Sequence, residues 1–201
     1  MRSIAVFVSV FALAATASAA PNVDRLTTIP LRLGINSIAQ FAPDGREARI
    51  AVGWRDNGNA HGYRVFLVLM PTKHGGMDWN VVGFEDGQSF SDELRDEPHT
   101  GEDVVRAVRF VRTGQKPAVI VASRKWSESY YDRAETTISI YHLRRTDGGP
   151  VTRDYFSVTR QWKARKSYCN AELALRDEVH LPLAPDYDGP NTVDGCIEGS
   201  K

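Results

Sequence analysis

Oxygen-bearing side chains that suit a hard cation gather in the segment Arg55–Gly62. Asp56, Asn57 and Asn59 lie close together there. Carboxylate and amide oxygens are the ligands that Ca²⁺ takes in proteins, so this spacing predicts a candidate cation site. The same residues also suit a plain β-hairpin, because Asn57-Gly58 tolerates the positive φ angles of a tight two-residue turn. We expect a hairpin at this position, with a bound cation such as Ca²⁺ as the alternative.

A second polar segment combines hydroxyl, carboxylate and aromatic groups. It follows Trp126 and consists of Ser127, Glu128, Ser129, Tyr130, Tyr131 and Asp132. Tyrosine presents both an apolar ring and a hydroxyl, and it is enriched where proteins contact their partners. The pattern therefore predicts a binding loop, while aromatic side chains that cap the end of a sheet fit the same residues.

Motifs of well-known enzyme classes are missing from the sequence. There is no G-x-S-x-G elbow, H-E-x-x-H pair, phosphate-binding loop or dinucleotide fingerprint. The histidines show no metal-ligand spacing, and His142 alternates with Ile140 along a candidate strand, as a structural histidine does. With 25 basic and 25 acidic residues, the chain also lacks the positive charge that a nucleic-acid partner favours. We therefore expect a binding protein rather than an enzyme, with no nucleic-acid partner.

The N-terminus has the pattern of an export signal. Arg2 precedes an apolar run over Ile4–Ala15, and Ala17-Ser18-Ala19 has the spacing of small residues that a signal peptidase cleaves. We predict cleavage after Ala19, which leaves one domain over residues 20–201. The apolar run is shorter than the ~20 residues that span a bilayer, so we expect a soluble exported protein without a membrane span.

Two cysteines, Cys169 and Cys196, remain after this cleavage. Exported proteins fold in an oxidising compartment, where paired cysteines form disulfides. A bond between these two would close a loop of about 28 residues and would stabilise the fold by roughly 3–4 kcal/mol in the chain-entropy description. We expect this disulfide, with two unpaired thiols as the alternative.

Alternating apolar residues predict that strands fill most of the chain. In Glu47–Arg55, the even-numbered residues Ala48 to Trp54 share one face. Further strands are expected over Tyr63–Met70, Asp78–Glu85, Asp103–Arg112, Ala118–Ala122, Thr136–Arg144 and Thr152–Trp162. One helix is expected over Ala171–His180, because Asn170 suits its N-cap and Pro182 its end. Strands at short spacing joined by hairpins predict an antiparallel sandwich or barrel with a short C-terminal helix.

Five stretches of the sequence together resemble the CarG-like carbapenem intrinsic-resistance family, which is akin in fold to periplasmic inhibitors of invertebrate-type lysozyme. They are Ile29–Asn36, Asn59–Tyr63, Val105–Arg112, Val119–Arg124 and Tyr168–Leu175. The resemblance extends over most of the chain after the signal, although each motif is short.

The resemblance implies an antiparallel β-sandwich in the periplasm that is often a homodimer and that holds a cation in some members. It implies self-protection against a carbapenem, with a β-lactam or one of its targets as partner. The alternative function is inhibition of a lysozyme, for which Ser127–Asp132 is the candidate loop. A family likeness is an analogy about function, so both functions are expectations at this stage.

Overall fold

The structure is a computed structural model that describes residues 26–58, 62–87, 89–97, 104–125, 132–146, 153–185 and 187. These residues form eleven strands and one helix. The predicted export signal over residues 1–19 lies outside the described residues. No helix among the described residues is long and apolar enough to cross a membrane.

The first half of the chain supplies seven of the strands. In chain order they are β1 (Leu26–Thr28), β2 (Gly34–Ile38), β3 (Ala48–Arg55), β4 (Tyr63–Pro71), β5 (Trp79–Glu85), β6 (Phe90–Ser91) and β7 (Leu94–Arg95). The second half supplies four long strands and the helix. These are β8 (Arg106–Thr113), β9 (Lys116–Arg124), β10 (Thr136–Arg145), β11 (Asp154–Lys163) and α1 (Ala171–Val179).

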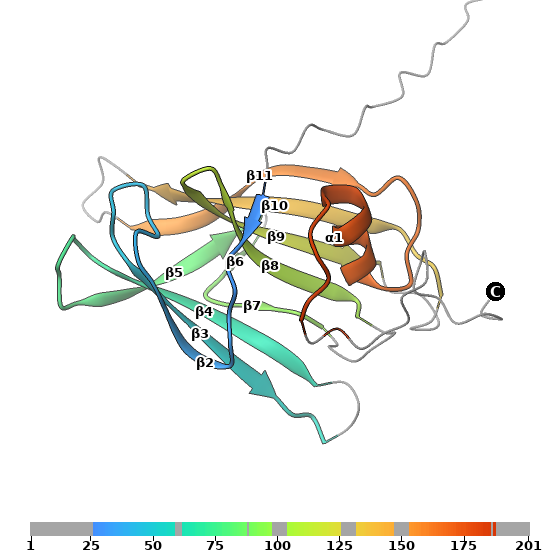
Figure 1. The fold of residues 1–201 in the computed structure, drawn as a ribbon, viewed down its shortest axis with the longest axis horizontal. Helices are drawn as coiled ribbons and strands as arrows, with labels where there is room; N and C mark the ends of the chain where they lie inside the picture. The colour runs from blue at the N-terminus through green and yellow to red at the C-terminus, as the bar shows by residue number, and fades with distance from the viewer. Residues whose placement is uncertain are drawn as a thin grey trace, which may run out of the picture.

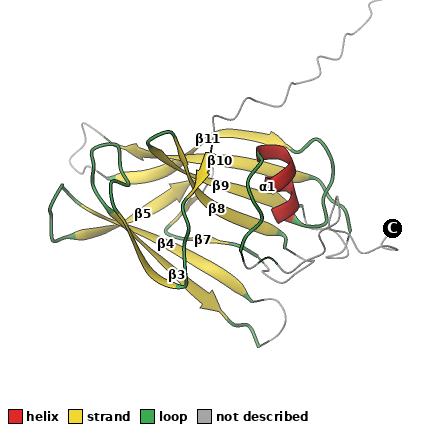
Figure 2. Ribbon diagram, viewed as in Figure 1, coloured by secondary structure: helices red, strands yellow, loops and turns green. Residues whose placement is uncertain are grey.

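The prediction of a mainly β chain with one short C-terminal helix is confirmed, but the expected antiparallel sandwich is wrong. The strands form one sheet in the order β1-β8-β9-β10-β11-β5-β4-β3-β2, which curls into a half-barrel (Figures 1 and 2). The pairing is mixed, because β11 runs parallel to β5. The chain passes through β6 to β10 between these two strands, and so long a connection permits parallel pairing.

Strand β5 joins the two antiparallel halves of the sheet. Its first half pairs with β4 through Val81 and Val82, and its second half pairs with β11 from Gly83 onward. The ring of Phe90 lies against Gly83, where an added Cβ would come within 2.0 Å of it. Gly83 thus leaves the space that this exposed ring occupies where β5 passes from one half of the sheet to the other.

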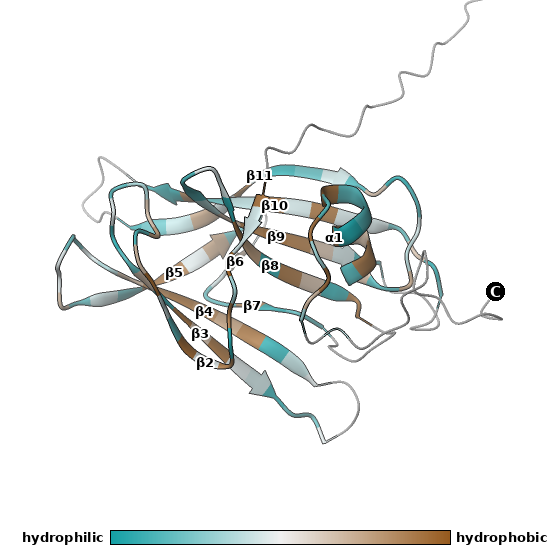
Figure 3. Cartoon of the chain, viewed as in Figure 1, coloured by the Kyte–Doolittle hydropathy of each residue, from teal (hydrophilic) through white to brown (hydrophobic). Residues whose placement is uncertain are grey.

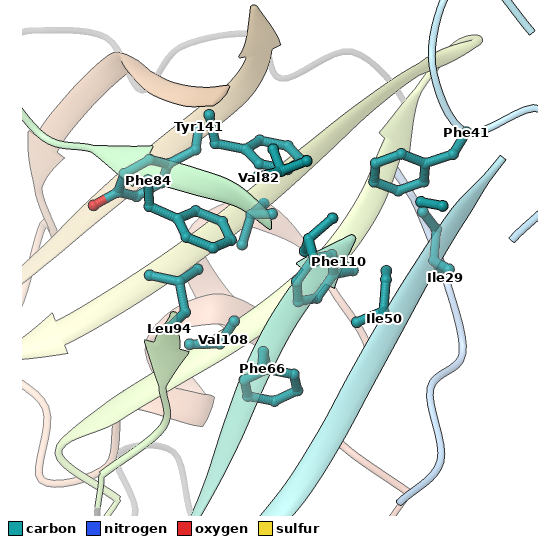
Figure 4. Close-up of a cluster of buried hydrophobic side chains, with 14 of the residues drawn as sticks. Ile29, Phe41, Ile50, Phe66, Val82, Phe84, Leu94, Val108, Phe110 and Tyr141 are labelled. Carbon is teal, nitrogen blue, oxygen red and sulfur yellow. The ribbon is translucent and has the colours of Figure 1, made fainter. Parts of the chain in front are cut away.

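Two hydrophobic cores lie on the two faces of the second half of the sheet. The first fills the concave space between β3–β5 and β8–β11, where the Phe84 and Phe156 rings stack with centroids 5.2 Å apart. Figure 4 shows Phe66, Phe84 and Phe110 pointing into this cluster. The second core lies between the convex face of β8–β10 and helix α1. Burial on both faces explains the continuous apolar run Pro117–Ala122 in β9 and the apolar side chains on both faces of β8 (Figure 3).

Helix α1 begins where the sequence predicts. The Asn170 side chain accepts a hydrogen bond from the Glu172 backbone N–H at 2.9 Å, as an N-cap does. The helix ends at Val179, one residue earlier than predicted, because His180 adopts the left-handed conformation with φ 58°. This residue turns the chain back across the sheet toward Pro182.

The two edges of the curled sheet are joined by a short linker. Strands β1 and β2 stand at opposite ends of the strand order, yet only residues 29–33 separate them in the sequence. Such a linker reaches at most about 20 Å, so it must bridge the open seam of the half-barrel. Pro30 has no N–H to donate, which ends the pairing of β1 with β8 and releases the chain into this linker.

Candidate functional site

The seam carries a groove with largely apolar walls. Two adjoining hollows, of about 330 and 250 Å³, share Leu31, Arg64, Phe66 and Pro185. The larger one is of the size at which small-molecule pockets begin, roughly 300 Å³. We name this pair of hollows the seam groove. Its further lining residues are Thr28, Ile29, Pro30, Arg32, Leu33, Val52, Trp54, Val108, Arg109, Phe110, Pro182, Leu183 and Ala184.

Four separate parts of the chain build the walls of the seam groove. The linker places Leu31 and Leu33 on one side, and Leu33 keeps 64% of its surface exposed. Strands β3 and β4 form the floor together with β8, and the segment Pro182–Pro185 closes the far side. The linker leaves β1 at Pro30, and the segment Pro182–Pro185 follows the left-handed His180, so backbone chemistry directs the paths of both.

Trp54 and Arg64 form a cross-strand pair at the mouth of the groove. Both continue the core-facing rows of their strands, where Val52 pairs with Phe66 one step deeper. Trp54 is 47% exposed, so its ring extends the apolar row of the core beyond the core itself. An aromatic ring that is held on one side and open on the other can receive a ligand.

The charge of Arg64 is balanced by Asp96. Asp96 is fully buried, and its carboxylate accepts hydrogen bonds from the Arg64 backbone N–H at 2.7 Å and from Nε at 2.6 Å. The guanidinium also lies over the ring of Phe66, 5.7 Å from its centroid. A second lining arginine, Arg109, is ion-paired with the buried Glu172 of α1. Carboxylates behind the walls therefore neutralise Arg64 and Arg109. The third lining arginine, Arg32 of the linker, is exposed.

This arrangement favours a compact ligand with a large apolar surface and one acceptor group. Apolar contact comes from Leu31, Trp54 and Phe66, and the guanidinium of Arg64, which lines both hollows, supplies N–H donors. A neutralised guanidinium still donates directed N–H groups, although it attracts distant anions weakly. The seam groove is thus suited to hold and orient a small molecule.

The expected tight turn at Asn57-Gly58 is wrong in its length. Strands β3 and β4 do form a hairpin, but its last pair joins Arg55 to Tyr63, so residues 56–62 make the connection. The Asp56 carboxylate accepts a hydrogen bond from the Gly58 backbone N–H at 2.7 Å, and Gly58 takes φ +69°. Asp56 thus shapes the start of the loop, as an Asx turn does.

The cation site predicted at Asp56, Asn57 and Asn59 stays a prediction, because Asn59 lies outside the described residues. Within the described part of the chain, no three His, Cys, Asp or Glu side chains lie close enough together to hold a metal ion.

The binding loop Ser127–Asp132 also stays a prediction, since only Asp132 belongs to the described residues. Its carbonyl accepts a hydrogen bond from Nη1 of Arg124 at 2.6 Å, which fixes the chain where it re-enters the sheet. Cys169 is fully buried just before α1, and Cys196 lies outside the described residues. The disulfide between them likewise stays a prediction.

Sequence reasoning missed the seam groove. Its residues come from positions as far apart as Thr28 and Pro185, so no local pattern connects them. Two signals were available in the sequence. Trp54 continues the apolar row of β3 past the last buried residue, and Pro30 interrupts the first apolar segment of the domain.

Comparison with known proteins places the fold. No protein-family profile matches the chain, and no curated protein matches it significantly. The structure is similar to the crystal structure of CarG, with a TM-score of 0.63 and 18% sequence identity over 75% of this chain and 94% of that one. The CarG-like fold expected from the sequence resemblance is therefore confirmed.

Proposed function

We propose that this chain is an exported, non-enzymatic binding protein of the carbapenem self-protection type, and that the seam groove holds its ligand. The ligand is a compact molecule with an apolar face and one carboxylate, as a β-lactam has. The observation that carries the proposal is the groove itself, which combines apolar walls with the directed N–H donors of Arg64. The CarG-like fold supports it as well.

The geometry suggests how such a ligand would sit. Its apolar face would lie on Trp54 and Leu31, and its carboxylate would accept hydrogen bonds at Arg64. The groove is small, so a ligand of this size would lose most of its contact with water on binding. Protection would then come from holding the antibiotic or from shielding a target, with no bond broken.

Binding is tested with purified protein and a carbapenem by calorimetry. We expect saturable binding that Leu33→Arg weakens at least tenfold, because the long cationic side chain fills the mouth of the groove. Met77→Arg is the matched control, since Met77 is 90% exposed and is not among the groove-lining residues. Equal binding by both variants, or none by the wild type, would refute the groove as the ligand site.

Function in cells is tested by expressing the same three proteins in a carbapenem-susceptible strain. We expect the wild type and Met77→Arg to raise the inhibitory concentration of the antibiotic, and Leu33→Arg to fail. An unchanged inhibitory concentration with all three proteins would exclude self-protection of the host cell.

Export into the periplasm, the Cys169–Cys196 disulfide and a homodimer are further parts of the proposal. The N-terminal pattern and the cysteine pair of the sequence support the first two. Fractionation of cells should place the protein in the periplasm. Thiol titration under denaturing, non-reducing conditions should then find no unmodified thiol, and light scattering should report the mass of a dimer.

Inhibition of an invertebrate-type lysozyme is the second candidate function. Arg124, which is only 3% exposed, holds the carbonyl of Asp132 and so anchors one end of the predicted loop Ser127–Asp132 on the sheet. An anchored loop suits insertion into an enzyme cleft. The purified protein should then slow cell-wall lysis, and Tyr130→Ala should lose this effect while Leu33→Arg keeps it. Full lysis at micromolar excess of the wild type would exclude this function.

A further inference from the structure

Two cationic side chains and a histidine surround a hollow on strands β9–β11 that shares no lining residue with the seam groove. The hollow, of about 560 Å³, is lined by Lys116, His142, Arg144 and Thr159, with Pro43, Pro117 and Leu143 completing it. None of these lining residues is acidic. We name this feature the cationic hollow.

The register of the sheet brings the charged groups together. His142 stands opposite Ala118 of β9, so Arg144 and Lys116, two positions further along each strand, come to lie on the same face. Both side chains are exposed, whereas the ring of His142 is half-buried between its neighbours. Three positive or protonatable groups therefore meet with no carboxylate among them.

A β-bulge brings a hydroxyl group to the same place. The pairing of β10 with β11 shifts between Ile140 and Tyr141, which leaves Thr159 without a partner in the register. The Thr159 hydroxyl lies 2.6 Å from Nδ1 of His142 and donates to the carbonyl of Ile140 at 3.3 Å. Bulges re-aim side chains in this way, often beside binding sites.

These contacts define how the protonated ring of His142 is held. In the neutral ring, Nδ1 donates to the Thr159 hydroxyl or accepts from it, according to the tautomer. In the protonated ring both nitrogens donate, so the hydroxyl accepts from Nδ1 and donates to the carbonyl of Ile140. Nε2 is then a further N–H donor beside Lys116 and Arg144.

The electrostatics of the hollow favour an anion. Burial lowers the pKa of His142, and the positive charges of Arg144 and Lys116 lower it further. Arg160 is a further exposed cation on β11, and the exposed Glu85 of β5 lies on the convex face beside Ser157. An anion seated between Lys116 and Arg144 would offset the repulsion between these two cations. It would also raise the pKa of His142, which their positive charges lower.

We propose that the cationic hollow binds a phosphate-type oxyanion, either free or as the phosphomonoester group of a larger ligand. Lys116 and Arg144 supply charge, and the protonated His142 supplies a third N–H donor. The site does not depend on the function proposed for the seam groove.

Sulfate is the first probe, because it is tetrahedral and keeps its charge between pH 5 and 8. The ring of His142 is followed by NMR at constant ionic strength, and inorganic phosphate is then titrated at one pH. We expect saturable shifts, a pKa of His142 that rises in sulfate, and sulfate affinity that increases as the pH falls.

Variants that each remove one positive charge distinguish a specific anion site from a general attraction of anions to the protein surface. Lys116→Gln and Arg144→Gln should each weaken sulfate binding at least fivefold, while Arg55→Gln, an exposed arginine at the end of β3, should leave it unchanged. Equal losses in all three variants, or no saturable shift at His142 in the wild type, would overturn the proposal.

Vesicles identify the source of the oxyanion. Phosphatidic acid vesicles that retain the wild type but not Arg144→Gln, with no retention by phosphatidylcholine, would assign the site to a lipid headgroup. Sulfate and phosphate binding without any retention by vesicles would assign it to a soluble phosphate ligand.

Discussion

The seam groove and the cationic hollow both present arginine to a cavity, but they treat its charge in opposite ways. In the groove, two of the three lining arginines, Arg64 and Arg109, are each paired with a buried carboxylate, Asp96 and Glu172, and the third, Arg32, is exposed. In the hollow, the lining residues include no carboxylate opposite Arg144. The groove therefore selects a ligand by apolar contact and directed hydrogen bonds, whereas the hollow selects by charge.

This difference also separates structural from functional roles. A buried ion pair between distant segments holds elements in place, and Arg64–Asp96 joins β4 to the chain after β7 in this manner. Exposed cations such as Lys116 and Arg144 hold no elements together in this way. Removing the buried ion pair of Arg64 and Asp96 should therefore lower the free energy of unfolding, whereas substituting Lys116 or Arg144 should weaken ligand binding.

The largest effect is expected from Asp96→Asn. The variant removes the charge that balances Arg64 and leaves a cation that is only 15% exposed, so we expect a loss of about 3–5 kcal/mol in the free energy of unfolding. Denaturant unfolding measures this loss of free energy. Glu93→Gln breaks an exposed ion pair with Arg95 and should cost under about 1 kcal/mol. Similar losses for the two variants would contradict the claim that the buried pair Arg64–Asp96 stabilises the fold more than an exposed ion pair does.

The sequence predicted the strands better than their arrangement. The alternation in Glu47–Arg55 and the two-sided apolar pattern of Tyr63–Met70 predicted the bounds of β3 and β4 to within one residue. Both strands could be predicted because each buries a regular face. Strands β1, β2, β6 and β7 were missed, since they are short and carry little alternation. The parallel contact of β5 with β11 joins segments some seventy positions apart, which no local pattern encodes.

The two sites were hidden from sequence reasoning for related reasons. The seam groove needs the linker, β3, β4, β8 and the chain after α1 to meet in space. The cationic hollow needs the bulge at Thr159, and the sequence shows His142 there only as one residue of an alternating strand. Pairing register across the sheet creates both sites, and register is set by the whole fold.

The next effect concerns the affinity of the groove. Trp54→Ala removes the aromatic wall at its mouth and should weaken carbapenem binding about tenfold, or about 1.4 kcal/mol. Phe90→Ala is the control, because Phe90 is an aromatic residue of similar exposure on the other side of β5. Calorimetry with both variants gives the comparison. Equal weakening would mean that Trp54 does not contact the ligand.

A smaller effect is expected from Arg144→Gln on the protein without ligand. The free energy of unfolding should change by less than about 0.5 kcal/mol, since the side chain is exposed. The pKa of His142 should rise, because one of the two positive charges that lower it is lost. NMR titration of the ring measures the shift, and a pKa equal to that of the wild type would show that Arg144 lies too far away to act.

The smallest effect is a pH dependence of stability that comes from His142. Its pKa in the folded protein is lowered, so the unfolded state binds more protons as the pH falls through about 6.5. Acidification from pH 7.5 to 5.5 should therefore destabilise the wild type more than His142→Gln. Unfolding curves at both pH values measure this difference, and a larger loss in the variant would contradict the assigned direction.

The most direct measurement is an NMR titration of the labelled wild type, first with a carbapenem and then with sulfate. The account predicts two separate sets of saturating backbone shifts. The carbapenem should move residues around Leu31, Trp54 and Phe66, and sulfate should move residues around Lys116 and His142, with neither ligand displacing the other. A carbapenem that binds at the cationic hollow in competition with sulfate, or that leaves the seam groove unperturbed at saturation, would contradict the account.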